Sequence, residues 1–376
     1  MPGVLGGGVA DLATPGAQRT VLGANVPPNR WQNPPMSLPA VSVLLPVYNA
    51  ARFLDGCLES LAAQTLTAFE IVAVDDGSTD GSAEILDRWR RREPRLRVLT
   101  RSHGGLITAL NHGLGACHAD VVARMDADDE SLSERLELQR ELLDADPGLD
   151  VVSCQVRHFA DDRPVGRGLR VYERWLNGLV SHEDILRERF IESPLPHPSV
   201  MVRRSALEEA NGYRDRGWPE DYDLWLRLAE AGHRFVKVPR ELVRWRDHGD
   251  RLTRRHRRYA VERFLECKAH FLARGPLAGI DRLVIWGAGQ TGRRLSKHLI
   301  RRGHPPGAFI DVDERKCGRT VRGAPVHPPD DLAALVAAPG RALVLTAVSS
   351  RGARELIRAR LVALGLVETR DFWCVA

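Results

Sequence analysis

Short apolar runs alternate with amphipathic segments over the first third of the chain, and this alternation strongly constrains the fold. The apolar runs begin at residues 41, 69, 96 and 120, and each has the composition of a buried strand. The segments between them have helical periodicity, so we expect helices at 51–64, 81–92, 105–116 and 133–145. Strands that alternate with helices indicate an α/β domain with a largely parallel central sheet. In such sheets ligands bind beyond the carboxyl ends of the strands.

The 376-residue chain is long enough for more than one domain. Residues 1–38 are rich in Gly and Pro and lack periodicity, which predicts a disordered leader. The alternating pattern and a mixed, aromatic-rich region together predict a domain over 39–274. The segment "GPLAG" (275–279) then resembles a hinge, and a strand–turn–helix pattern beyond it predicts a smaller α/β domain over 280–376.

Composition narrows the class of protein. The hydrophobic fraction is 43% and no run of eighteen apolar residues occurs, so a spanning helix is not expected. The start of the chain lacks the layout of a signal peptide, which favours a cytoplasmic protein. The net charge of +5 rests on arginine rather than lysine, and we do not expect nucleic acid as a partner. The basic run at 251–263 is read either as a solvated helix face or as a contact for lipid headgroups or an anionic acceptor.

The stretch "AFEIVAVDDGSTD" ends a buried strand on two adjacent acids, Asp75 and Asp76. A strand-to-helix turn with caps at residues 78–80 explains Gly77 and the residues after it. It does not explain the two carboxylates, which repel each other unless hydrogen-bond donors surround them. The ring N–H and ribose hydroxyl groups of a nucleoside are suitable donors, so the sequence predicts a ligand site here.

The stretch "ARMDADDE" follows another apolar strand, and Asp126 and Asp128 are two residues apart. In extended geometry they share one side of the chain. Two hard oxygen ligands suit Mg²⁺ or Mn²⁺ with bound phosphate oxygens. The alternative is an acidic turn, in which Asp129 and Glu130 are exposed acids.

The stretch "WPEDYDLWLRLAEAGH" has the start and stop signals of a helix. Its periodicity places Asp221 on the inward face with Leu224 and rotates Glu220 and Asp223 away from it. First-turn acids commonly complement the helix dipole, which suffices for the two outer acids. An inward carboxylate at a cleft wall is suited to act as a general base.

These stretches, with "VSVLLPVYNAARFLDGCLESLAAQTL", "PHPSVMVRRSAL" and "RWRDH", together resemble family 2 of the GT-A-fold inverting glycosyltransferases over residues 40–255. The resemblance implies a hexosyltransferase-like enzyme with a GT-A (Rossmann-like) sheet domain and a Mg²⁺ or Mn²⁺ cofactor. It also implies a UDP-, GDP- or dTDP-sugar donor and a glycan or lipid-linked acceptor. Synthesis of polysaccharide or cell-envelope glycan, at the inner face of a membrane, is the family-level expectation.

The resemblance assigns roles to individual residues. Pro46, Tyr48 and Asp76 would line the nucleoside pocket, and Asp126 would contact the nucleotide sugar. Asp126, Asp128 and His248 would hold the metal. Asp221 would take the proton from the acceptor hydroxyl. His197 is read either as a residue near the acceptor or as a structural histidine.

The stretch "IWGAGQTGRR" places Gly287, Gly289 and Gly292 in GxGxxG spacing between a strand and a helix, and Asp311 follows. The spacing fits a nucleotide cradle at a helix N-terminus. The region also resembles the nucleotide-sugar-binding domain of some sugar acetyltransferases. Nucleotide or nucleotide-sugar binding and a structural or regulatory role both remain open.

Two other functions remain open for the first domain. A nucleotidyltransferase acting on sugar phosphates would also use acidic metal ligands, although no phosphate loop rich in Gly and basic residues lies near the first strand. A non-catalytic nucleotide-sugar-binding protein is the second alternative.

Overall fold

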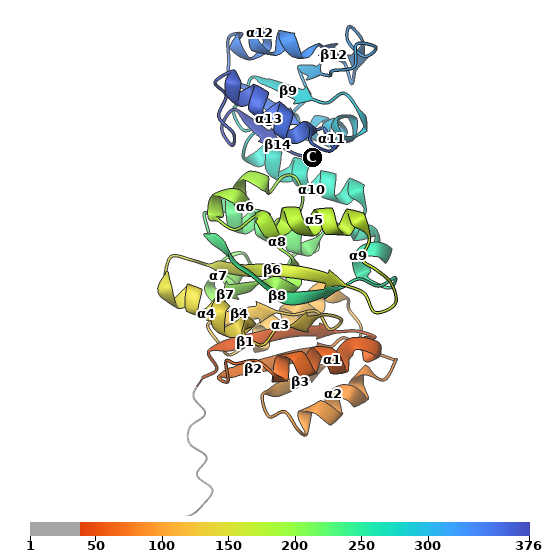
Figure 1. Ribbon diagram of the computed structural model, residues 1–376, viewed down its shortest axis with the longest axis vertical. Helices are drawn as coiled ribbons and strands as arrows, with labels where there is room; N and C mark the ends of the chain where they lie inside the picture. Colours follow the sequence, from red (N-terminus) through yellow and green to blue (C-terminus); the bar gives the residue numbers. More distant parts are fainter. Residues whose placement is uncertain (1–37) are drawn as a thin grey trace, which may run out of the picture. The chain divides into compact units, whose positions relative to one another are not determined.

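A computed structural model of the protein describes residues 38–376, so nearly all of the expected leader lies outside the described residues. The larger of its two sheets has the order β3-β2-β1-β4-β7-β6-β8-β5 (Figure 1). Its strands are β1 (Val41–Val47), β2 (Phe69–Asp75), β3 (Leu96–Thr100), β4 (Val121–Arg124), β5 (Glu130–Ser131), β6 (Val151–Phe159), β7 (Met201–Arg203) and β8 (Phe235–Arg246).

The helices of this part are α1 (Ala51–Ala62), α2 (Ser82–Arg90), α3 (Leu106–Ala116), α4 (Arg135–Ala145), α5 (Arg167–Gly178), α6 (His182–Glu188), α7 (Arg204–Glu209), α8 (Glu220–Glu230), α9 (Leu252–Arg255) and α10 (Val261–Arg274). Short 3₁₀ turns lie at His197–Ser199 and Arg257–Tyr259. The basic run at 251–263 is therefore divided among α9, a 3₁₀ turn and the start of α10, and is not one helix face.

The sheet is parallel through β3, β2, β1 and β4, as the alternation predicts. Strand β7 is antiparallel to its neighbours β4 and β6, and β5 is antiparallel to β8, so the far half of the sheet is mixed. Strand β1 has β2 on one side and β4 on the other. The carboxyl ends of these three parallel strands lie side by side, and Asp75, Asp76 and Asp126 lie at or just beyond them.

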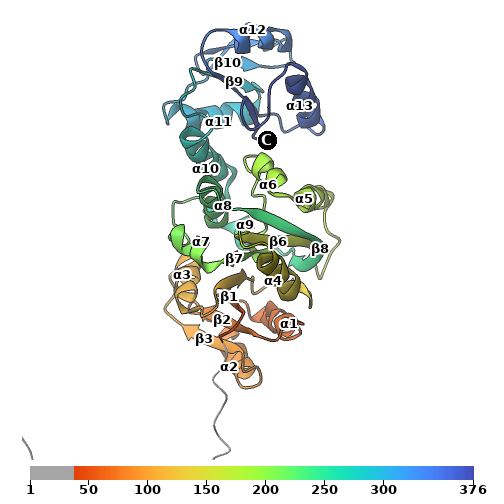
Figure 2. The same cartoon turned by 90° about the vertical axis from the view of Figure 1, so that its left-hand side faces the viewer.

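The alternation of side chains in β1 fills two separate cores. Val43 and Leu45 belong to a cluster with α1, α2 and α4, whereas Leu44 belongs to a cluster with α3, α7 and α8. Figure 2 shows α1 and α4 on one side of the sheet and α3 and α7 on the other. A strand buried on both faces has no polar face, which explains the near-continuous apolar runs in the sequence.

The second sheet has the order β11-β12-β10-β9-β13-β14 and is parallel except at β11. Its strands are β9 (Arg282–Trp286), β10 (Ala308–Ile310), β11 (Thr320–Val321), β12 (Ala324–His327), β13 (Ala342–Thr346) and β14 (Phe372–Cys374). Helices α11 (Gln290–Ile300), α12 (Leu332–Ala337) and α13 (Ala353–Ala363) and a 3₁₀ turn at Pro329–Asp331 accompany it. The predicted fold class, an α/β sheet domain followed by a smaller α/β domain, is confirmed.

The second sheet shares a hydrophobic core with α8 and α10. Tyr222 of α8, Phe271 of α10 and Ile285 of β9 belong to one buried cluster. Leu277, in the segment expected to be a hinge, is also fully buried in it. Lys268 Nζ donates to the carbonyl oxygens of Ile191 (2.5 Å) and Val375 (3.1 Å), which ties both parts to α10. Among the described residues no helix is long and apolar enough to cross a membrane.

The packing of α3 on the sheet generates a stability prediction. A Cβ added at Gly113 would lie 2.4 Å from Leu44 Cδ1 and 2.7 Å from Val74 Cγ2, so helix and sheet touch closely there. We expect Gly113→Ala to lower the free energy of unfolding by roughly 1–3 kcal/mol through overpacking. Gly115, in the same helix, has open space at the corresponding position. Gly115→Ala should therefore raise it by up to about 1 kcal/mol.

Urea denaturation of the two variants and the parent tests this pair. Equal stabilities of Gly113→Ala and Gly115→Ala would contradict the close approach of α3 to β1 and β2.

Candidate active site

Asp75 and Asp76 are both buried, and the chain itself supplies their hydrogen-bond donors. Asp75 Oδ1 accepts from the Ser78 amide at 2.9 Å. Asp76 pairs with Arg101 and accepts from the amides of Gly104 (3.1 Å) and Gly105 (2.8 Å). The burial of these acids therefore does not by itself require a ligand. The donors to Asp76 come from the segment at 101–105, which we call the strap. The sequence patterns do not identify this segment.

Tyr48 lies at the end of β1 and its ring stacks on His103, with centroids 4.0 Å apart. His103 in turn lies 2.9 Å from Asp76, measured from Nδ1 to Oδ2. Tyr48 is 47% exposed, so part of its ring is accessible beyond the carboxyl end of β1. Pro46 is buried within β1, one register step before the strand end. Tyr48 and Asp76, expected in one pocket, are thus linked through His103.

The carboxylates of Asp126, Asp128 and Asp129 form a cluster after β4. One oxygen from each lies within 4.8 Å of the others. Asp126 pairs with the buried Arg124, and His248 Nε2 lies 2.8 Å from Asp128 Oδ2. His248 is thus brought to the aspartates from the far end of β8, although 120 residues separate it from Asp128 in the sequence.

Asp129 is 1% exposed, which contradicts the alternative interpretation of this stretch as an acidic turn with Asp129 exposed. Its Oδ1 accepts from the Arg246 amide at 2.7 Å, and its Oδ2 is buried without a hydrogen-bond partner among the described residues. Burial, together with the charges of Asp128 and Asp126, raises the pKa of Asp129 well above the ordinary range. Burial opposes ionisation of Asp128 as well, but the His248 hydrogen bond and the charge of Arg251 hold its pKa below the usual value.

This donor set fits a hard divalent cation. Three carboxylates within one ligand shell, one with an unpaired buried oxygen, carry negative charge that an oxygen-seeking ion such as Mg²⁺ or Mn²⁺ would neutralise. No thiolate belongs to the cluster, since Cys57 donates from Sγ to the Asp126 carbonyl oxygen at 3.3 Å.

Asp221 lies in the first turn of α8 and faces the same pocket as Asp126 and Asp128. The pocket has a volume of about 160 Å³. The Asp221 carboxylate accepts only from the adjacent Tyr222 amide, at 2.7 Å, among the described residues. Burial and the neighbouring charge of Glu220 raise the pKa of Asp221 to about 8.

The expected rotation of Glu220 and Asp223 away from the interior is wrong, because α8 is buried on most of its circumference. Both carboxylates are more buried than Asp221. Glu220 accepts from the Tyr259 hydroxyl at 2.9 Å, and Asp223 accepts from the side chains of Trp218 (2.8 Å) and Arg227 (2.6 Å). Glu220 lines the same pocket, and Asp221 differs from it in having a carboxylate oxygen that accepts no hydrogen bond from the described residues.

His197 is a buried histidine whose Nε2 lies 2.9 Å from the Tyr213 hydroxyl. Burial and the charge of Arg124 lower its pKa well below the usual value, so it is neutral. It lines the pocket and also has a structural partner. Other pocket residues that the sequence motifs do not identify are Arg124, Tyr172, Glu192, Arg251 and Tyr259. The basic run at 251–263 includes Arg251, but the sequence did not indicate that Arg251 lines this pocket.

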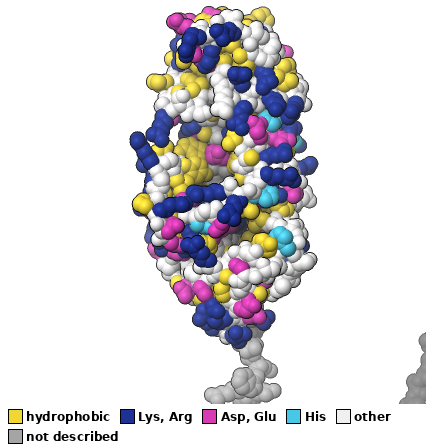
Figure 3. Space-filling view, turned by 90° about the vertical axis from the view of Figure 1, so that its right-hand side faces the viewer, with side chains coloured by type: hydrophobic (Ala, Val, Ile, Leu, Met, Phe, Trp, Pro, Cys, Tyr) yellow, Lys and Arg dark blue, Asp and Glu magenta, His cyan; other side chains and the backbone are white. Residues whose placement is uncertain are grey.

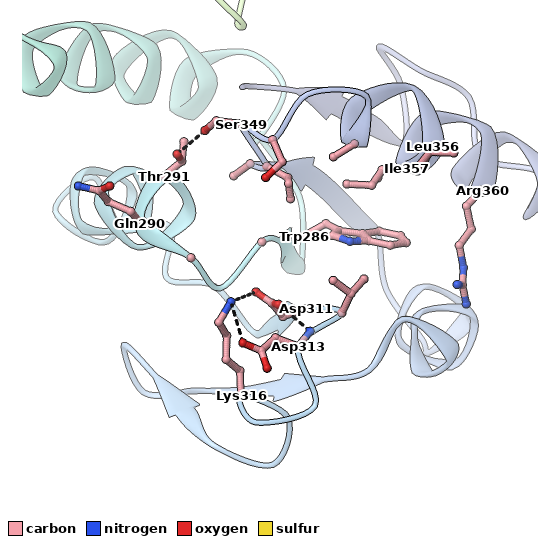
Figure 4. Close-up of a pocket in the computed structure, with 17 residues that line it drawn as sticks. Trp286, Gln290, Thr291, Asp311, Asp313, Lys316, Ser349, Leu356, Ile357 and Arg360 are labelled. Atoms are coloured by element: carbon pink, nitrogen blue, oxygen red, sulfur yellow. Dashed lines mark hydrogen bonds and ion pairs between the residues drawn. The ribbon is translucent and has the colours of Figure 1, made fainter.

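A second pocket, of about 750 Å³, lies at the carboxyl ends of β9, β10 and β13 (Figure 4). Gly287, Gly289 and Asp311 line it, but Gly292 does not. Asp311 Oδ2 accepts from the Ala288 amide at 2.9 Å and pairs with Lys316 at 3.0 Å. Asp311 therefore braces the glycine loop, and Lys316 offers a positive charge beside it.

Comparison with known proteins identifies one matching family and several similar chains. Residues 42–210 match the family described as "Glycosyl transferase family 2". The amylovoran biosynthesis glycosyltransferase AmsE of Erwinia amylovora is 35% identical over 217 residues, which cover 57% of this chain and 79% of AmsE. The Escherichia coli UDP-Gal:alpha-D-GlcNAc-diphosphoundecaprenol beta-1,3-galactosyltransferase is 27% identical over 237 residues, covering 62% of this chain and 83% of that enzyme. The structure of S. aureus TarS 1–349 in complex with UDP has a TM-score of 0.48 at 18% identity, covering 69% of this chain and 71% of that one.

The carboxylate cluster generates a prediction about metal binding. Mn²⁺ should raise the melting temperature of the protein, because an ion that binds only the folded state stabilises it by about 2.7 kcal/mol at one hundred times its dissociation constant. Asp128→Asn should abolish most of this increase. Asp87→Asn, at an exposed site whose ion-pair partner among the described residues is Arg90 alone, should retain it. A Mn²⁺ response that Asp128→Asn leaves intact would place the ion elsewhere.

Proposed function

Because the chain belongs to glycosyl transferase family 2 and is a glycosyltransferase, we propose that it transfers a sugar from a nucleotide-activated donor to a hydroxyl acceptor with inversion at the anomeric carbon. The observation that carries this proposal is the meeting of Asp126, Asp128 and Asp221 around one pocket. These residues come from the end of β4 and the first turn of α8, about a hundred residues apart in the sequence.

The donor would lie along the carboxyl edge of β1, β2 and β4. The exposed Tyr48 ring, fixed by its stacking on His103, offers a face for the base. Both oxygens of Asp76 are engaged within the chain, so Asp76 would contribute to this pocket by holding the strap at 101–105, whose His103 stacks on Tyr48. Pro46 would support this pocket from within β1.

Asp126 and Asp128, with Asp129 behind them, would hold a divalent cation, and His248 would orient Asp128. A bound Mg²⁺ or Mn²⁺ supplies Lewis-acid stabilisation of the charge that develops on the departing diphosphate. Arg124 fixes the carboxylate of Asp126, and Arg251 brings a second positive charge to the pocket. Preorganised charges of this kind stabilise a developing anion without reorganisation.

Asp221 would act as the general base. The bond between the anomeric carbon and the diphosphate oxygen breaks while the acceptor oxygen bonds to the same carbon from the opposite face. The acceptor hydroxyl proton passes to Asp221, and the nucleoside diphosphate leaves with the bonding electrons. Burial supports this role, because a carboxylate with a pKa of about 8 is a stronger base than an exposed one.

The acceptor class follows from the relatives only as a proposal. By their names, one relative acts in amylovoran biosynthesis and another uses UDP-Gal and a diphosphoundecaprenol-linked sugar. We therefore assign this chain to the assembly of a polysaccharide or cell-envelope glycan from a nucleotide-sugar donor. A nucleotidyltransferase is disfavoured by the family, and it would release pyrophosphate instead of a nucleoside diphosphate.

Substitution of the proposed base generates a kinetic prediction. Asp221→Asn should retain donor binding and lose about 10²- to 10⁴-fold in turnover, the usual contribution of a positioned base. Donor binding is measured by calorimetry with UDP- and GDP-sugars, and turnover by release of nucleoside diphosphate. Asp215→Asn, at an exposed acid just before α8, is the matched control and should keep turnover.

The pH dependence provides an independent check. The base must be deprotonated to accept a proton, so turnover should rise with pH and level off above about 8, where Asp221 is ionised. Asp221→Asn should remove this rise. A parent enzyme whose turnover falls between pH 7 and 9 would rule Asp221 out as the base.

The pocket of the second sheet supports a second candidate function, nucleotide binding. Gly287 has a φ of 121°, and a Cβ at Gly292 would lie 1.9 Å from the Gly287 carbonyl oxygen, so the fold requires both glycines. Gly289 has an ordinary φ of −79° and open space beside it. The fold does not require glycine there, which favours a loop kept bare for a phosphate group at the start of α11.

This difference between the glycines is testable. Gly289→Asp places a good N-cap residue at the start of α11, so the melting temperature should be kept or raised. Its charge should repel a phosphate, and the affinity for UDP or NAD should fall at least about tenfold. Binding is measured in an Asp128→Asn background, which removes metal-dependent binding at the first site. A nucleotide affinity unchanged by Gly289→Asp would contradict this second site.

A further inference from the structure

A third cavity, of about 980 Å³, lies between the two sheet domains and shares lining residues with the aspartate pocket. Its walls come from α5, α10, α11 and the loop at 348–352 that follows β13. The residues that line both this cavity and the aspartate pocket are Tyr172, Glu192, Tyr259 and Phe264. The interdomain cleft and the aspartate pocket are therefore adjacent, with these four side chains at their boundary.

Three arginines that line the interdomain cleft carry uncompensated charge. Among the described residues Arg167, Arg174 and Arg351 have no carboxylate within ion-pair distance, and all three are exposed. Other basic residues of the cleft are neutralised or engaged, for example Arg294 by Glu262 at 2.6 Å. Figure 3 shows a hollow on this face, with hydrophobic side chains within it and basic side chains around it.

The inner part of the interdomain cleft is suited to a sugar. Tyr172 and Trp175 of α5 line it with ring centroids 5.8 Å apart, opposite Phe264 of α10. Aromatic faces pack against the C–H faces of sugar rings, and tyrosine also offers a hydroxyl. The Glu192 carboxylate, which accepts only from the adjacent Ser193 amide among the described residues, is available to acceptor hydroxyl groups.

The charges also give the cleft a direction. Glu192 lines both the cleft and the aspartate pocket, whereas the three arginines line the cleft alone. A bound molecule would thus place hydroxyl groups toward Asp221 and negative charge away from it. Arg167 and Arg174 come from the first domain and Arg351 from the second, so neither domain forms the site alone.

We propose that the interdomain cleft binds the acceptor, a glycan that carries phosphate or carboxylate groups on the side away from its reacting hydroxyl. The proposal rests on the proposed sugar transfer and names the acceptor class of that same site. It also gives the second domain a role in transfer, because its 348–352 loop supplies one wall of the cleft. Electrostatic complementarity of this kind contributes to both specificity and association rate.

The test measures binding of three synthetic probes in the absence of donor and metal. The first is N-acetylglucosamine linked to decyl diphosphate, the second is a tetrasaccharide that contains glucuronate, and the third is the neutral decyl glycoside of N-acetylglucosamine. At least one anionic probe should bind about tenfold or more tightly than the neutral one. A response of the first alone identifies a diphosphate linkage as the recognised anion, and a response of the second alone identifies acidic sugars.

The triple variant Arg167→Gln, Arg174→Gln, Arg351→Gln should lose this preference, because each exposed charge pair contributes modestly and their effects accumulate. The matched control, Arg91→Gln, Arg301→Gln, Arg319→Gln, removes the same net charge from exposed positions outside the three pockets and should keep it. Equal binding of all probes, an unaffected triple variant or an equally weakened control would each overturn the proposal.

Failure of this proposal is distinguishable from failure of sugar transfer. Probe binding needs no turnover, so Asp221→Asn should bind the anionic probe like the parent. If the triple arginine variant loses the preference for anionic probes but the parent releases no nucleoside diphosphate from any donor, the acceptor proposal for the cleft is supported and the sugar-transfer proposal is wrong. If transfer proceeds and the triple variant leaves the acceptor KM unchanged, transfer stands and the cleft proposal falls.

Discussion

The mutual repulsion of carboxylates at one edge of the sheet is the constraint on which the arrangement of this site depends. Asp126, Asp128 and Asp129 present oxygens within 4.8 Å of one another, and like charges at that distance strongly oppose ionisation. Two of these three carboxylates have a basic partner within the chain: Arg124 pairs with Asp126, and His248 lies beside Asp128. Asp129 has only a backbone amide on one oxygen. The chain therefore does not fully neutralise the negative charge of the cluster. A divalent cation would neutralise it, whereas further basic side chains would obstruct the pocket.

The same principle separates the two acidic motifs. Asp75 and Asp76 are as buried as Asp129, but amides and Arg101 surround them, so their charge is already stabilised within the chain. Asp76 therefore holds the strap at 101–105 in place beside Tyr48. The carboxylates of the cluster after β4 have fewer hydrogen-bond donors within the chain, so this cluster is suited to bind a cation. Two pairs of similar appearance in the sequence thus differ in function because of the loops that pack against them.

Much of the fold was predictable because its determinants are local. The continuous apolar runs of β1 and β2 and the amphipathic periodicity of the neighbouring helices follow from side-chain pattern alone. The observed bounds of these elements differ from the expected ones by at most two residues at each end. The pairing of β7 against β4 and β6 was not predictable from the local pattern, since its partners lie about eighty and about fifty residues away in the sequence. The burial of Glu220 and Asp223 was missed because α8 packs against other elements on most of its circumference, which the periodicity of the helix did not indicate.

The site shows the same division between local and long-range determinants. Motif residues such as Asp126 and Asp221 carry a sequence signal because their chemistry depends on residue type and a short spacing. Arg124 lies two residues from Asp126 but looks like any residue at a strand end, and Arg167, Arg174 and Arg351 look like surface arginines. Arg124 pairs with Asp126, whereas Arg167, Arg174 and Arg351 have no carboxylate within ion-pair distance among the described residues, which only the folded chain reveals. Their position around a single cavity, and not the lack of a partner alone, indicates where an anion would bind.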